Sequence, residues 1–222
     1  MTEGYLVPDL PSGGFFREEE TVKRSRFIVT VGRAASPEAA HVFIEKIREE
    51  HSQATHNCWA FNAGEPGSTA QVGASDDGEP KGTAGRPMLT AVLHSGIGEV
   101  VVVVTRYFGG ILLGAGGLVR AYSRGAAEAV NACGVGVMHP TLRILVDVPY
   151  AMLSRVEFFL KSAPVLVEDK AFAEQVTLTL LVRDTDAAAL EAKLIDLSEG
   201  TLEPVRFDEF YYAWKEVEAP PA

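Results

Sequence analysis

Hydrophobic and polar positions follow two different periods along the chain, and their order predicts a mixed α+β protein. Residues 27–31 have the apolar content of a strand. Ser36 can then cap a helix whose first position is Pro37. Apolar residues recur after it with the period of a helix, at Ala40, Phe43, Ile44 and Ile47. The pattern predicts a helix after Ser36 that buries this face.

The same signals continue to Gly134, whose position predicts a helix stop. Strands are expected at 55–61, near 70–72 and at 100–104, with helices starting at Pro87 and spanning 118–133. Within the first of these strands His56 and Cys58 share one face, because strand side chains alternate. The third is an uninterrupted β-branched run, which is typical of a strand covered on both faces.

The rest of the chain predicts a second unit with a different order of elements. Strands are expected at 142–148, 165–167, 176–182 and 205–212, with helices at 150–161 and 187–197. That order is βαββαβ, the ferredoxin-like unit. We therefore expect a loose arm at 1–14, an N-terminal domain at 15–136, a C-terminal domain at 137–215 and a frayed tail at 216–222, including the Ala219-Pro220-Pro221-Ala222 end.

Composition narrows the class of protein. The chain has 222 residues, of which 47% are hydrophobic and 23% charged, enough for one large core or two smaller ones. Its net charge of -10 argues against binding nucleic acid over the whole surface. The apolar run 100–104 is too short to cross a bilayer, and residues 1–4 do not resemble a signal peptide, so we expect a cytoplasmic protein. Cys58 and Cys133 have neither zinc-site nor disulfide spacing, which predicts reduced thiols.

Two turn-like stretches, 76–85 and 105–120, combine acids, bases and glycines and are the candidate site. Glycines between a buried strand and a helix leave backbone amides open to an anion, although a tight turn explains them equally well. Their spacing matches neither a Walker loop nor the dinucleotide fingerprint. The candidate ligand-binding residues are Lys23, Arg26, His56, Asp76, Asp77, Glu79, Lys81, Thr83, Arg106, Tyr107, Gly109, Gly110, Gly114, Gly117 and Arg120.

The three acids of this set, Asp76, Asp77 and Glu79, could hold magnesium or accept hydrogen bonds from Arg106 or Arg120. We favour the internal ion pair and predict no metal and no cofactor, leaving Lys81 and Thr83 as the donors that face a ligand. Tyr107 either stacks on a base or forms a core edge.

No catalytic residue is predicted. His56 and Cys58 lie roughly 7 Å apart on an extended strand, which is long for a base and its nucleophile. Cys58 is expected to be buried and inert, and His56 to be either a structural histidine or a ligand contact. The cations Lys23, Arg24, Arg26, Arg106, Arg120 and Arg124 form either a basic patch or a scattered set.

Four motifs, 23–27, 54–61, 76–87 and 105–122, resemble the YigZ group of the IMPACT family, and the resemblance extends over nearly the whole chain. It implies an N-terminal UPF0029-type domain sharing the β-α-β arrangement of elongation factor G domain four and of the GHMP kinases. It also implies a C-terminal domain similar to domain five of that factor. Eukaryotic members regulate translation by binding a partner of a stress kinase, and for the bacterial group the resemblance implies nucleic-acid or ribosome binding.

The sequence has no segment like the N-terminal RWD domain of the eukaryotic members. It also lacks the Pro-x-x-x-Gly-x-Gly-Ser-Ser loop expected of a GHMP kinase. Three functions remain open. The first is a noncatalytic protein that binds RNA or the ribosome, with Lys23, Arg26, Arg106 and Arg120 on phosphates. The second is an enzyme acting on a phosphorylated small molecule or nucleotide, with magnesium on Asp77 or Glu79 and His56 as acid or base. The third is a protein-interaction module in translation or stress control, without nucleic acid.

Overall fold

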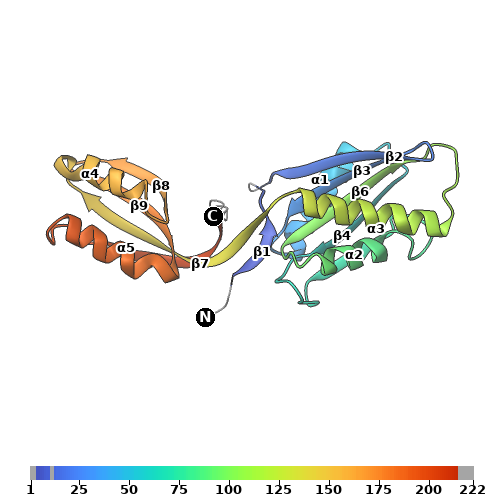
Figure 1. Ribbon diagram of the computed structural model, residues 1–222. Coiled ribbons are helices and arrows are strands. Elements are labelled where there is room, and N and C mark those ends of the chain that lie inside the picture. The colour runs from blue at the N-terminus through green and yellow to red at the C-terminus, as the bar shows by residue number, and fades with distance from the viewer. Residues whose placement is uncertain (1–3, 11–12, 215–222) are drawn as a thin grey trace, which may run out of the picture. The chain divides into compact units, whose positions relative to one another are not determined.

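The computed structural model describes residues 4–10 and 13–214, which divide into two compact units, Tyr5–Val137 and Met138–Trp214 (Figure 1). Strand β7 (Val135–Val148) carries the chain from the first unit into the second. The first unit also contains β1 (Tyr5–Pro8), β2 (Phe15–Val22), β3 (Ser25–Arg33), α1 (Pro37–Glu50), β4 (His56–Asn62), β5 (Val72–Ser75), α2 (Gly85–His94), β6 (Val100–Tyr107) and α3 (Ala115–Ala132). The expected mixed α+β class with two domains is confirmed.

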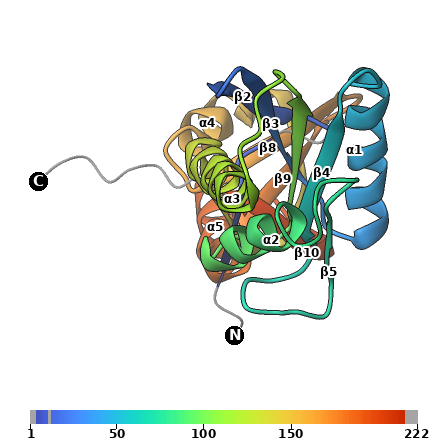
Figure 2. The ribbon, with the colours of Figure 1, turned by 90° about the vertical axis from the view of Figure 1, so that its right-hand side faces the viewer.

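The first unit is built on an antiparallel sheet with the order β2-β3-β6-β4-β5. Figure 2 shows α1 on one side of this sheet and α2 with α3 on the other. Because side chains alternate along β6, Val101 and Val103 pack on the α1 side, whereas Val100, Val102 and Val104 pack toward α2 and α3. The valine run is therefore buried on both faces, as its sequence predicts.

Helix α1 forms as its sequence pattern predicts. The Ser36 hydroxyl accepts a hydrogen bond from the Ala39 amide at 3.1 Å, and Pro37 occupies the first turn. The buried residues of the helix are the predicted Ala40, Phe43, Ile44 and Ile47. Local capping chemistry and amphipathic spacing were sufficient here.

The second unit has the predicted βαββαβ order. After β7 come α4 (Tyr150–Leu160), β8 (Val165–Phe172), β9 (Val176–Arg183), α5 (Asp184–Leu197) and β10 (Val205–Trp214). Strands β8 and β7 flank β9, and β10 pairs with β7. Alternate residues of β7 and β9 pack with α4 and α5 in one core that includes Ile144, Leu178, Leu180 and Leu194. Tyr211, Tyr212 and Trp214 belong to β10, as expected of sheet residues.

Four local predictions need correction. The arm before Phe15 is not loose throughout: β1 is ordered, Val7 is fully buried, and Leu6 accepts a hydrogen bond from the Gly98 amide at 2.8 Å. Strand β2 was missed because its Arg-Glu-Glu-Glu run hides the alternation of an edge strand. Strand β5 begins at Val72, later than expected. Helices α2 and α3 begin before Pro87 and Leu118, so Gly116 and Gly117 lie in the first turn of α3.

Predictions for 1–3, 11–12 and 215–222 lie outside the described residues. In the part of the chain that the structure describes, none of the helices has both the length and the apolar composition needed to span a bilayer.

Candidate functional site

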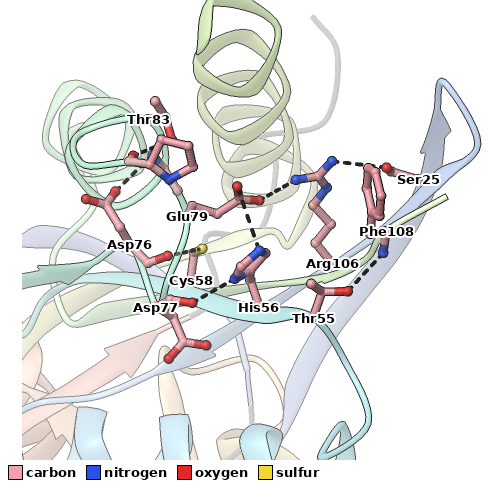
Figure 3. Close-up of polar contacts among 12 residues, drawn as sticks. Ser25, Thr55, His56, Cys58, Asp76, Asp77, Glu79, Thr83, Arg106 and Phe108 are labelled. Carbon is pink, nitrogen blue, oxygen red and sulfur yellow. Dashed lines mark hydrogen bonds and ion pairs between the residues drawn. The ribbon is translucent and has the colours of Figure 1, made fainter. Parts of the chain in front are cut away.

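The candidate site lies at the end of the first sheet where β6 ends and where β3 and β4 begin (Figure 3). Arg106 pairs in register with Phe27 on β3 and with His56 on β4. Cross-strand partners point to the same face of a sheet, so all three side chains lie on the α2 and α3 side. The sheet register therefore brings together residues that are far apart in the sequence.

A buried ion pair forms the centre of the site. Arg106 donates from Nη1 to Glu79 Oε1 at 2.6 Å and from Nη2 to the Ser25 hydroxyl at 3.2 Å. The Tyr122 hydroxyl donates to the same Glu79 oxygen at 2.8 Å. Burial above all, and then the neighbouring Cys58 and Glu79, raise the pKa of Tyr122, so its hydroxyl stays protonated. The predicted internal ion pair is confirmed for Glu79 and Arg106.

The same geometry corrects the expected role of Arg106. The residue is only 4% exposed, and its guanidinium lies 5.4 Å from the centre of the Phe27 ring and 5.4 Å from that of Phe108. A side chain so enclosed does not present its charge to a phosphate at the surface. Arg106 instead joins the end of β6 to the loop 76–84 through Glu79, which in turn accepts a hydrogen bond from Tyr122 on α3.

His56 and Cys58 occupy the same face of β4, and both are hydrogen-bonded to residues 76–84 between β5 and α2, which we call the acidic loop. His56 Nδ1 lies 2.8 Å from the carbonyl oxygen of Asp77, so this nitrogen must carry the proton, and Nε2 faces Glu79 Oε2 at 3.9 Å. The Cys58 thiol donates to the Asp76 carbonyl at 2.9 Å. Burial raises the pKa of this thiol to about 12, so it stays protonated and unreactive, as expected.

The carboxylates of Asp76 and Asp77 are both used within the protein. Asp76 accepts from the amides of Gly82, Ala84 and Gly85 at 2.7–3.0 Å and so satisfies the start of α2. Asp77 accepts from the Asn57 amide at 2.6 Å and pairs with Arg48. These acids shape the loop. Among residues 4–10 and 13–214, no group of three or more His, Cys, Asp and Glu side chains is arranged to hold a metal.

Asp76→Asn is expected to lower the free energy of unfolding at neutral pH, and the difference from wild type should shrink in acid. Burial raises the pKa of Asp76, but the three backbone amides outweigh it and lower the pKa overall. A lowered folded pKa gives stability that is present above the unfolded value of about 3.9 and lost as pH falls through the folded value. Urea unfolding of both proteins from neutral pH down to about pH 3 measures the difference in their free energies of unfolding. A gap between the two proteins that stays constant with pH would contradict this role.

The two donors predicted to face a ligand from this loop differ in accessibility. Thr83 is 6% exposed and its hydroxyl donates to the Pro80 carbonyl at 2.6 Å, so it is not available to a ligand. Lys81 is exposed. The loop therefore presents one of the two predicted donors.

The glycine-rich stretch after β6 leads into the start of α3. Gly110 and Gly114 have φ of 83° and 73°, and a Cβ at either position would meet nothing within 4 Å. Gly114 is the N-cap of α3, with no side-chain cap and no acidic residue in the first turn. Arg120 Nη1 lies 3.9 Å from the place of a Cβ on Gly116. The first amides of an 18-residue helix and a guanidinium thus share one exposed corner.

Most arginines of the first unit are paired with acids, including Arg26 with Glu19 at 2.7 Å. The guanidinium of Arg26 also lies 5.6 Å from the centre of the Tyr107 ring, and the Tyr107 hydroxyl lies 3.0 Å from His51 Nδ1. In the first unit, six exposed cations have no ion-pair partner among the described residues: Lys23, Arg24, Lys46, Lys81, Arg86 and Arg120. Lys46 lies on α1, near the Phe15 ring, and the other five lie in the β2–β3 turn, in the acidic loop, in the first turn of α2 and in the second turn of α3.

Sequence reasoning missed Ser25, Arg86 and Tyr122 as members of the site. Tyr122 fits the apolar stripe of its helix, and nothing local indicates that its hydroxyl meets Glu79, 43 residues away. Arg86 carried a signal, because it stands beside Pro87, where the sequence predicts the start of a helix. The basic residues Lys23 and Arg24 were expected before a strand and instead form its hairpin turn, with φ of 47° and 66°.

Comparison with known proteins identifies relatives over most of the chain. The Impact N-terminal domain matches residues 23–130, and a domain of unknown function, DUF1949, matches residues 146–201. The IMPACT family member YigZ of Escherichia coli is 38% identical over 93% of this chain and 100% of its own length. The IMPACT family member YvyE of Bacillus subtilis is 38% identical over 82% of this chain and 83% of its own. A crystal structure of a hypothetical protein matches with a TM-score of 0.61 and 36% identity, covering 94% of this chain and 99% of the other.

Proposed function

The chain belongs to the IMPACT family, and from that premise we propose that it is a noncatalytic cytoplasmic regulator of translation or stress responses that binds RNA, alone or on the ribosome. Membership confirms the resemblance drawn from the sequence motifs and suggests a regulatory protein. RNA as the ligand is the further step, and its support comes from the surface of the first unit.

The observation that carries the proposal is the set of unpaired cations at one end of the first unit. Lys23 and Arg24 form the β2–β3 turn, and Arg120 lies over the uncapped start of α3. The loop that leads into α3 packs against the β2–β3 turn, because a Cβ on Gly109 would lie 1.9 Å from the Arg24 carbonyl oxygen. Cations without protein partners beside open helix amides suit phosphate oxygens.

The net charge of -10 does not contradict this proposal, because the acids concentrate elsewhere. The second unit carries the larger acidic excess, and two of the three consecutive glutamates of β2 are paired, Glu19 with Arg26 and Glu20 with Arg124. A local basic surface on an acidic protein limits nonspecific attachment while leaving one face able to bind a polyanion.

Of the four predicted phosphate contacts, two have a different role in this proposal. Lys23 and Arg120 remain direct phosphate contacts, joined by Arg24 and Lys81, whereas Arg106 and Arg26 act through their ion pairs. Glu79 and Arg106 keep the acidic loop and the end of β6 in place, so the surface cations are held on ordered backbone.

The test is binding of labelled single-stranded RNA, and cosedimentation with ribosomes, across a salt series. We expect steep salt dependence in the wild type. In a triple variant with Lys23, Arg24 and Arg120 changed to Ala, affinity should fall and the slope of log K against log salt should decrease by about two, or about 0.7 per lost phosphate contact.

Arg124→Ala is the matched control, since Arg124 lies one turn after Arg120 on α3 and is paired with Glu20. It should bind like the wild type. Absence of binding at every salt concentration, or the same loss in Arg124→Ala as in the triple variant, would count against RNA as the ligand.

A further inference from the structure

A group of apolar side chains is exposed at the same end of the first unit. Phe108, Ile111 and Leu112 from the loop after β6 are 44%, 40% and 81% exposed, and Val119 on α3 is 36% exposed. We call these four residues the apolar tip. Leu113, next in the loop, is 9% exposed and packs in the core, so the loop is anchored by one leucine and presents the other.

The loop that carries the apolar tip is held in place by its neighbours. The Phe108 amide donates to the Thr55 hydroxyl at 3.1 Å (Figure 3), and the Gly109 amide donates to the Ser25 hydroxyl at 3.3 Å. The Phe108 ring covers the buried guanidinium of Arg106 and keeps 44% of its surface exposed. These contacts hold Phe108 in one position, so its ring is presented to a ligand without being ordered first.

The unpaired cations stand on both sides of the apolar tip. Figure 1 shows the loop between β6 and α3 running beside the β2–β3 turn, which carries Lys23 and Arg24. On the other side Val119 is followed directly by Arg120. A ligand that covers the tip therefore meets positive charge at its edges and apolar surface at its centre.

An apolar surface flanked by cations should bind unpaired RNA and duplex RNA differently. A duplex presents phosphates and sugar hydroxyls and keeps its base faces stacked inside, so it would satisfy the cations and leave the apolar tip exposed. An unpaired segment presents phosphates together with unstacked base faces, which pack on aromatic and apolar side chains. We propose that this surface is selective for unpaired RNA, with bases on Phe108 and Leu112 and phosphates on Lys23, Arg24 and Arg120. This inference rests on the proposed function and specifies its ligand.

The experiment compares a single-stranded RNA of about 12 nucleotides with the same sequence annealed to its complement, at one salt concentration. The wild type should bind the single strand at least about tenfold more tightly. Leu112→Asn should weaken single-strand binding about fivefold or more, as loss of one base contact does, while binding of the duplex changes little. Phe108→Leu keeps an apolar side chain over Arg106 and should also weaken binding of the single strand.

Val42→Asn is the control, because Val42 is also an exposed apolar residue, at 73%, but lies on α1. It should leave both affinities unchanged. A melting temperature equal to that of wild type establishes that Leu112→Asn is folded, and the 81% exposure of Leu112 makes that the expected result.

The outcomes separate this inference from the function on which it rests. No binding of either RNA overturns the proposed function. Equal binding of both forms, with the triple cation variant impaired and Leu112→Asn normal, overturns selectivity for unpaired RNA and leaves RNA binding in place. Ribosome binding that survives nuclease and high salt but is lost in Leu112→Asn overturns the inference in favour of a protein partner of the tip.

Discussion

Arg106→Ala is expected to lower the free energy of unfolding by about 3–5 kcal/mol, because the side chain is only 4% exposed and forms a buried ion pair. Its partner Glu79 is 7% exposed, and after the change its carboxylate would keep only the Tyr122 hydroxyl and the more distant His56 ring. A buried charge without its counter-charge is far less stable than the pair. Urea unfolding followed by far-UV circular dichroism measures the loss.

Two further variants test whether the loss of stability comes from burial of the Glu79 charge. Arg26→Ala breaks an ion pair with Glu19 in which both side chains are about half exposed, so its unfolding midpoint should match that of wild type. The double variant Arg106→Ala with Glu79→Ala removes both charges and should be more stable than Arg106→Ala alone. A double variant at least as unstable as the single one would contradict the account based on an uncompensated carboxylate.

Arg106 also shows which part of the site could be predicted from the sequence. Acids and bases in two neighbouring turns indicate an ion pair, and the pair forms. Which residues form pairs depends on the sheet register, which places Arg106 beside His56 and Phe27. Asp77 pairs instead with Arg48 on α1. Sequence spacing carries no information about that register, because β3 and β6 are separated by about half of the unit.

Because sequence spacing does not give long-range contacts, helices and strands were predicted better than the exposure and pairing of surface side chains. Ser36 with Pro37, and the valine run of β6, act through contacts within a few residues or through burial on both faces. Whether Leu112 is buried or exposed is not decided locally, because two consecutive leucines between glycines can point either way. Likewise, a list of arginines does not separate Arg124, which is paired, from Arg120, which is not.

Gly109→Ala and Gly116→Ala are expected to have opposite effects on stability, although the two glycines belong to one short stretch. A Cβ on Gly109 would lie 1.9 Å from the Arg24 carbonyl oxygen and 2.6 Å from the Ser25 amide nitrogen, so backbone must move. Overpacking of this kind costs about 1–3 kcal/mol or more. A Cβ on Gly116 would meet only Arg120 Nη1, at 3.9 Å. There alanine should raise helix stability by up to about 1 kcal/mol.

The pair also separates the two explanations of the glycine-rich stretch, a tight turn or an open anion site. Gly109 is required by the close approach of the β2–β3 turn, so Gly109→Ala should displace Lys23 and Arg24 and weaken RNA binding together with stability. Gly116 has open space and no structural need for glycine, so Gly116→Ala should gain stability. If it nevertheless loses affinity for RNA, the added methyl group obstructs a ligand at the start of α3, because the one protein atom near it, Arg120 Nη1, lies at 3.9 Å and is not displaced. Unfolding and RNA titration of the two variants therefore assign each glycine to packing or to binding.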